Sequence, residues 1–118
     1  MDHLIEVLRL IAADYQVQRD ALPQLASLAD EIALLYSDEL RNVMPSSLIA
    51  DDEVRAKLVS MDRLFETMSE TKSFWTDEAV STGAEWQQLR QRARDVLAYL
   101  KQPLEAPRLT WLTYVQSG

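Results

Sequence analysis

The chain of 118 residues has no cysteine, one histidine (His3) and only two glycines, one of which is the last residue. The lack of cysteine excludes disulfides, thiol catalysis and cysteine-ligated metals. One histidine is too few for a multi-histidine metal site, and two glycines are too few for a glycine-rich phosphate-binding loop. The sequence therefore predicts no cofactor and no bound metal.

Long apolar runs are also absent. No segment approaches the roughly 20 apolar residues that are needed to span a bilayer. The first residues, 1–6, are acidic and helix-forming, unlike the basic start and apolar centre of a signal peptide. We expect a cytoplasmic protein that does not associate with a membrane, and the length suits a single domain.

Acidic residues outnumber basic ones and are unevenly placed, with a net charge of −7. Residues 1–85 contain 17 acidic and 7 basic residues, whereas residues 86–118 contain 2 acidic and 5 basic residues. Most of the chain would repel a polyanion, so we expect no nucleic-acid binding. The acidic residues form either a solvated surface or one half of an interface with a basic partner.

Apolar residues recur at helical spacing in four segments. They predict helices over about 2–20 and 24–43, a third helix that begins after Asp51, and a fourth that ends before Pro103. Short connections and the lack of a convincing strand favour an all-α fold, specifically an antiparallel four-helix bundle. We assign residues 1–103 to this bundle and residues 104–118 to an extended tail, which packs on the bundle or on a neighbouring chain.

Three local signals predict helix starts. Asp51 is expected to cap the third helix, with acidic residues following it at the positive end of the helix dipole. Thr76 is expected to cap one short extra turn. Thr82 and Glu85 fit a capping box, in which each side chain bonds the backbone N–H of the other residue and starts the fourth helix.

Glu39 is the one carboxylate that the helical wheel places inside an apolar stripe. Burying it costs several kcal/mol unless it is paired and hydrogen-bonded. Lys57 and Arg90 flank apolar stripes of other helices and are the candidate partners in a buried ion pair. Otherwise the apolar stripe ends before Glu39, or Glu39 lines a pocket as a general acid or base with a raised pKa.

Acidic and aromatic residues outside the core are the candidates for binding a partner protein. Acidic faces accelerate association with basic partners, and aromatic side chains anchor interfaces. The candidate partner-binding residues are Asp30, Glu31, Asp38, Asp51, Asp52, Glu53, Trp111 and Tyr114.

Two stretches resemble a pattern in small bacterial helical proteins. They are residues 29–35, and residues 75–79 together with Glu85-Trp86, Leu89-Arg90 and Ala93. In size, acidity and helicity the whole chain also resembles the immunity proteins of bacterial toxin systems. That resemblance implies a protein that neutralises a toxin, often a basic nuclease, by binding it tightly.

We therefore expect a non-enzymatic protein-binding module, in its most concrete form an immunity or antitoxin-like protein. Two alternatives stay open. One is a small helical enzyme or ligand-binding bundle with a pocket around Glu39. The other is a homodimer that closes its own groove with the tail.

Overall fold

The computed structural model describes residues 2–22, 27–44 and 51–110. These residues form six α-helices and one 3-10 helix and contain no strand, so the all-α prediction is confirmed. The number of helices exceeds the four that were predicted. The elements are α1 (Asp2–Ala12), α2 (Tyr15–Ala21), α3 (Leu28–Val43), α4 (Asp52–Met68), η1 (Lys72–Trp75), α5 (Asp77–Thr82) and α6 (Ala84–Tyr99).

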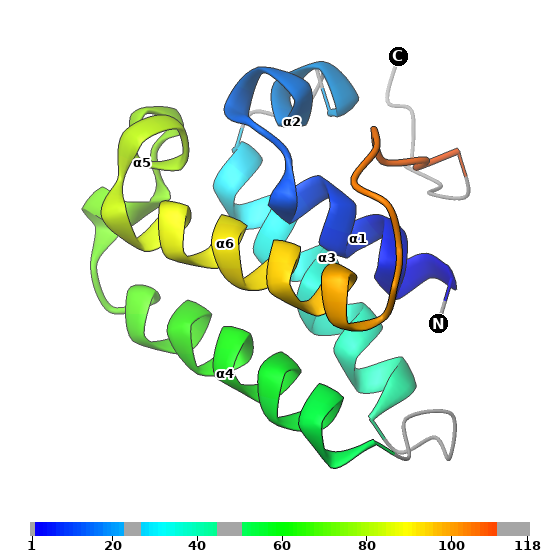
Figure 1. The fold of residues 1–118 in the computed structure, drawn as a ribbon. Helices are drawn as coiled ribbons and strands as arrows, with labels where there is room; N and C mark the ends of the chain where they lie inside the picture. Colours follow the sequence, from blue (N-terminus) through cyan, green and yellow to red (C-terminus); the bar gives the residue numbers. More distant parts are fainter. Residues whose placement is uncertain (1, 23–26, 45–50, 111–118) are drawn as a thin grey trace.

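Helices α1 and α6 form the centre of the packing. α1 contacts α3 and α6, and α6 also contacts α4 (Figure 1). Three aromatic rings pack in a row in the core, one each from α3, α4 and α6. The ring centroids of Tyr36 and Phe65 are 5.4 Å apart, and those of Phe65 and Trp86 are 5.8 Å apart. All three side chains are buried, and each removes a large apolar area from water.

The first predicted helix is divided in two. The structure ends α1 at Ala12 and begins α2 at Tyr15, whereas the apolar stripe predicted one helix over 2–20. The second predicted helix also starts later than expected. Ser27 precedes α3 and its hydroxyl accepts a hydrogen bond from the Asp30 backbone N–H, at 3.4 Å, as an N-cap.

Two of the three predicted helix starts are confirmed. The Asp51 side chain accepts hydrogen bonds from the backbone N–H groups of Glu53 and Val54 at the start of α4. The Thr76 hydroxyl accepts a hydrogen bond from the Ala79 backbone N–H at the start of α5. Each cap satisfies donors that have no partner within the first turn of the helix.

The predicted capping box at Thr82 is wrong. Thr82 is the last residue of α5, and its hydroxyl donates to the Glu78 carbonyl. Gly83 is both the C-cap of α5 and the N-cap of α6, without a side-chain cap. Its backbone N–H donates to the Ala79 carbonyl at 2.7 Å, and a Cβ on Gly83 would lie 2.6 Å from that oxygen. A side chain at residue 83 would collide with this oxygen, so glycine fits the junction where α5 ends and α6 begins.

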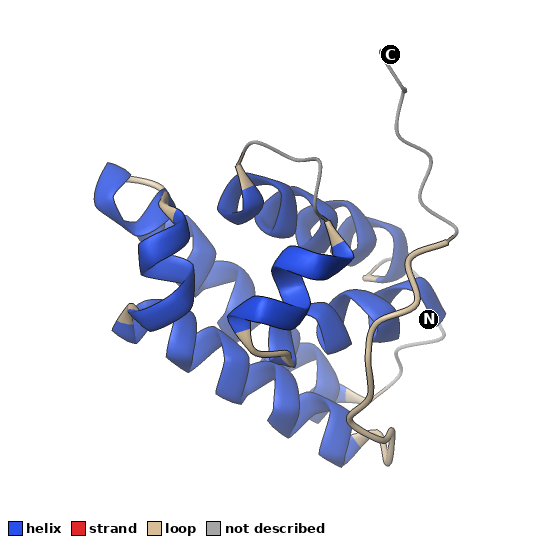
Figure 2. Ribbon diagram, turned by 90° about the horizontal axis from the view of Figure 1, so that it is seen from above, coloured by secondary structure: helices blue, strands red, loops and turns tan. Residues whose placement is uncertain are grey.

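Helix α6 ends at Tyr99, and Lys101, two residues later, adopts a left-handed conformation with φ of 59°. The Gln102 backbone N–H then bonds the Leu97 carbonyl at 2.8 Å, which closes the helix in the manner of a Schellman motif. Residues 102–110 continue without helix (Figure 2) and run beside α1. Arg9 of α1 donates to the Pro103 carbonyl, and the Arg108 backbone N–H donates to Glu6 at 2.8 Å.

Candidate functional site

A surface hollow lined by described residues lies between α3 and η1, and we name it the α3–η1 groove. It has a volume of about 560 Å³. Leu34 lines it and is 53% exposed. The residues that line the groove are Asp30, Ala33, Leu34, Ser69, Lys72 and Trp75.

Trp75 forms a fixed wall of this groove. Its indole Nε1 donates to the Met68 carbonyl at 2.8 Å, and its ring packs edge-to-face on Trp86 at 6.0 Å. Trp86 is itself buried, and its Nε1 donates to the Phe74 carbonyl at 2.7 Å. Both indole N–H groups have partners, so the apolar face of Trp75 is held in place before anything binds.

Two predicted partner-binding acids bracket Leu34. Asp30 lies one helical turn before it and Asp38 one turn after it, and all three side chains are exposed on α3. Asp30 accepts a hydrogen bond from the Ser27 hydroxyl at 2.7 Å, and Asp38 forms an ion pair with Arg41 at 2.6 Å. The latter pair is exposed and contributes little to stability, so both carboxylates remain accessible to a basic group.

The other predicted acids do not all belong to this surface. Glu31 is half-buried on α3 next to Asp30, but Asp51, Asp52 and Glu53 lie at the start of α4. The start of α4 contacts the far end of α3, where Arg55 donates to the Met44 carbonyl (Figure 1). At 1.5 Å per residue, Asp30 lies about 21 Å along the helix axis from Met44, whereas Asp38 lies about 9 Å from it.

The acids at the start of α4 have local partners. Asp51 accepts a hydrogen bond from the Tyr99 hydroxyl at 2.9 Å, and this bond, with those from the helix N–H groups, lowers the pKa of Asp51. Glu53 forms an ion pair with Lys57 at 3.4 Å. Asp51 therefore stabilises the start of α4 and the α4–α6 contact. The predicted aromatic anchors Trp111 and Tyr114 lie outside the described residues.

The predicted ion pair of Glu39 with Arg90 or Lys57 is wrong. Glu39 is half-buried, and neither cation contacts it: Lys57 pairs with Glu53 and lies over the Tyr99 ring, 5.6 Å from its centroid. Arg90 is buried and bonds backbone carbonyls instead. Glu39 lines neither the α3–η1 groove nor the two smaller hollows described below.

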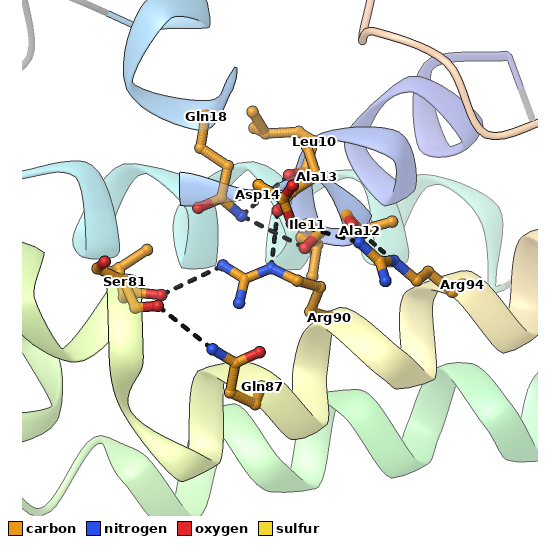
Figure 3. A network of polar contacts seen from close by, with 11 residues as sticks. Leu10, Ile11, Ala12, Ala13, Asp14, Gln18, Ser81, Gln87, Arg90 and Arg94 are labelled. Carbon is orange, nitrogen blue, oxygen red and sulfur yellow. Dashed lines mark hydrogen bonds and ion pairs between the residues drawn. The ribbon is translucent and has the colours of Figure 1, made fainter. Parts of the chain in front are cut away.

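Arg90 belongs to a buried polar network that ends α1 (Figure 3). Its Nε donates to the Ala13 carbonyl at 2.7 Å, and Arg94 Nε donates to the Ala12 carbonyl at 3.0 Å. The fully buried Gln18 amide donates to the carbonyls of Leu10 and Ile11. The last turn of a helix leaves carbonyls without partners, and three side chains satisfy them here.

The side chains of this network bond backbone carbonyls of residues 10–13. Burial lowers the pKa of the Arg90 guanidinium from its usual value, with a smaller opposing effect of Asp14. Arg90 and Arg94 lie four residues apart on α6, where like charges repel each other. Backbone carbonyls accept hydrogen bonds from both guanidinium groups, and Asp14 pairs with Arg94 at 3.5 Å. Every residue has a backbone carbonyl, so the sequence does not show which carbonyls will accept hydrogen bonds from Arg90 and Arg94. These contacts could therefore not be predicted from the sequence.

Two smaller hollows lie elsewhere. One of about 270 Å³ lies between α4 and α6, where Arg92 donates to the Ser60 hydroxyl. The other, of about 240 Å³, lies between α1, α2, α6 and residues 104–106, and we name it the α1–α6 hollow. In the described part of the chain, no three or more acidic or histidine side chains gather into a group suited to a metal ion.

Comparison with known proteins adds no relative. No protein-family model, no curated protein and no solved structure matches this chain. Among the described helices, none has the length and apolar character needed to cross a membrane.

Proposed function

We propose that the chain works by binding a basic protein and that the partner docks in the α3–η1 groove. The observation that supports this most is Leu34, a 53% exposed leucine in a hollow, placed between the exposed carboxylates of Asp30 and Asp38. A single exposed leucine is ordinary on a protein surface. Here, however, a fixed tryptophan lies in the same hollow and acids lie one turn away on both sides.

The chemistry of the groove specifies the docking segment. An aliphatic or aromatic side chain of the partner packs between Leu34 and Trp75, where both surfaces lose water on contact. Arginine or lysine residues on both sides of that apolar side chain meet Asp30 and Asp38. Lys72 is the one base that lines the groove, and it favours a segment whose basic residues lie toward α3.

An immunity or antitoxin-like protein, acting in the cytoplasm, is the concrete form of this proposal. Its support is the acidic net charge of −7 and the resemblance in size and helicity, together with the groove. In this role the protein covers the basic substrate-binding surface of a toxic nuclease. The proposal requires no reacting group on this chain, and acid at the interface accelerates capture of the toxin.

Short peptides test the groove without knowledge of the natural partner. We would titrate the protein with a synthetic 15-residue helical peptide that carries a central leucine and an arginine four residues to each side, and with its glutamate counterpart. The arginine peptide is expected to bind, and more weakly as salt rises, because salt screens the contacts with Asp30 and Asp38. The glutamate peptide is expected not to bind.

Two exposed leucines provide a matched control. Leu34→Ser is expected to weaken binding of the arginine peptide about tenfold, as loss of one buried apolar side chain does. Leu104→Ser removes an equally exposed leucine outside the groove and is expected to leave binding unchanged. Equal binding of both peptides, or equal effects of both substitutions, would contradict the proposal.

The immunity role needs its own test. We would co-express the chain with the product of the gene next to its own in the genome and measure growth and nuclease activity. Protection, lost in Leu34→Ser and retained in Leu104→Ser, supports the role. No complex and no protection would reject the immunity role and leave the peptide result to decide on the groove.

A further inference from the structure

Two of the four exposed large apolar side chains in the described residues line the same hollow. Val17 of α2 is 40% exposed, Leu104 of the C-terminal segment is 59% exposed, and both line the α1–α6 hollow. Residues 103–108 lie against α1, where Arg9 donates to the Pro103 carbonyl and Glu6 accepts a hydrogen bond from the Arg108 backbone N–H. Apolar surface on both sides of one hollow indicates a surface that a protein can cover.

The charges of this hollow cancel. Arg9 and Arg94 line it together with Asp14 and Glu105, so its net charge is zero, whereas the chain as a whole carries −7. The Arg9 side chain is 7% exposed and forms ion pairs with Glu6 at 2.6 Å and Glu105 at 3.4 Å. Arg94 and Asp14 lie 3.5 Å apart, with side chains 38% and 82% exposed.

We propose that the α1–α6 hollow is the interface between two copies of this chain. Two molecules of net charge −7 repel each other, and they approach at least cost where each presents a neutral, apolar-edged surface. A two-fold interface must be self-complementary. Arg94 and Asp14, 3.5 Å apart in each copy, present one charge of each sign at the edge of the hollow, so that Arg94 of one copy meets Asp14 of the other and the contact repeats across the axis. Leu104 of each copy then packs at the hollow of its partner.

This inference does not depend on the proposed function, because the hollow and the α3–η1 groove share no lining residue. Binding in the α3–η1 groove and self-association through the α1–α6 hollow are also expected to respond to salt in opposite directions. Salt weakens the docking of a basic segment on acids. Salt strengthens the self-association of an acidic chain through a neutral surface, because it screens the overall repulsion.

Light scattering and sedimentation equilibrium of the full chain test the interface. The wild-type protein is expected to dimerise, more tightly at about 0.5 M than at about 0.05 M salt, a range over which the screening length falls severalfold. Leu104→Asp is expected to weaken the dimer by about tenfold or more, because it places a charge where an apolar side chain is buried. Leu34→Asp adds the same charge on an equally exposed leucine and is expected to leave the dimer unchanged.

Two further variants test the charge contact. Arg94→Glu and Asp14→Arg are each expected to weaken the dimer. A mixture of the two variants is expected to restore association, because only the mixed dimer has opposite charges at both contacts across the axis. Circular dichroism and thermal unfolding verify that each variant is folded. A wild-type chain that stays monomeric at high concentration, or a dimer that Leu34→Asp and Leu104→Asp weaken equally, would overturn the proposal.

Discussion

Arg90 on α6 donates a hydrogen bond to the Ala13 carbonyl, 77 residues earlier in the chain, at 2.7 Å. A second bond, at 3.2 Å, reaches the Val80 carbonyl in α5. One buried guanidinium therefore joins the end of α1 to α5 and α6. The protein uses its most deeply buried α6 cation to connect three helices.

Replacing this arginine is expected to be strongly destabilising. Arg90→Met keeps the apolar stem but leaves the carbonyls of Ala13 and Val80 without these donors, so we expect a loss of about 2–4 kcal/mol in the free energy of unfolding. Arg90→Lys retains the charge without the fork of donors and is expected to lose less. Urea unfolding measures both, with Arg63→Met on the exposed face of α4 as the control. Equal stability of the Arg90→Met and Arg63→Met variants would show that the network contributes little.

Gly83 is expected to tolerate no side chain. A Cβ there would lie 2.6 Å from the Ala79 carbonyl oxygen, which is backbone and can move only if α5 shifts against α6. We expect Gly83→Ala to cost about 1–3 kcal/mol, as overpacking does. Thermal unfolding measures it, with Ser81→Ala as a control two residues away. A neutral Gly83→Ala would mean that the junction between α5 and α6 is adjustable.

We expect glycine at position 101 to make the protein more stable than the lysine found there. Its φ of 59° places it in the left-handed region, where a side chain carries a conformational cost that glycine avoids. Lys101→Gly is expected to raise the free energy of unfolding by about 0.5–1 kcal/mol. Lys101→Ala, which removes the charge and keeps the Cβ, is the control. A stabilisation of the same size in Lys101→Ala would assign the effect to charge.

Tyr36 is expected to make stability sensitive to alkaline pH. Its hydroxyl donates to the Leu58 carbonyl at 2.6 Å, and burial raises its pKa above the usual value of about 10. Its contribution is complete below about pH 10 and is lost as pH rises further, because the unfolded chain ionises first. Tyr36→Phe is expected to cost about 1 kcal/mol at neutral pH and to reduce the loss above pH 10. Urea midpoints from about pH 7 to pH 11 measure both effects, and an unchanged alkaline loss in Tyr36→Phe would contradict this explanation.

The sequence predicted those helix starts that depend only on residues next to each other in the chain. Asp51 and Thr76 cap helices as expected, because a cap needs only its own next three residues. The break after Ala12 was not predictable, since Arg90, Arg94 and Gln18 satisfy the carbonyls that a continuous helix would have used itself. The capping box predicted at Thr82 does not form, because Thr82 belongs to α5 and Gly83, packed closely on the Ala79 carbonyl, is the N-cap of α6.

The candidate site was predicted only in part. Asp30 and Asp38 were identified from charge and helical phase, and both lie beside the α3–η1 groove. Leu34 and Trp75 were missed as partners, because their proximity depends on how η1 returns to α3. Asp51, Asp52 and Glu53 were grouped with them on charge alone, but these three residues lie at the start of α4, and most of the length of α3 separates them from Asp30.

A map of backbone amide chemical shifts during titration with the arginine peptide tests the central proposal most directly. If the α3–η1 groove is the docking site, the largest shifts fall on residues 30–38 and 69–75, and Leu34→Ser removes them. If the largest shifts fall around Arg9 and Arg94, or if Leu34→Ser leaves the map unchanged, the groove is not where a basic partner binds.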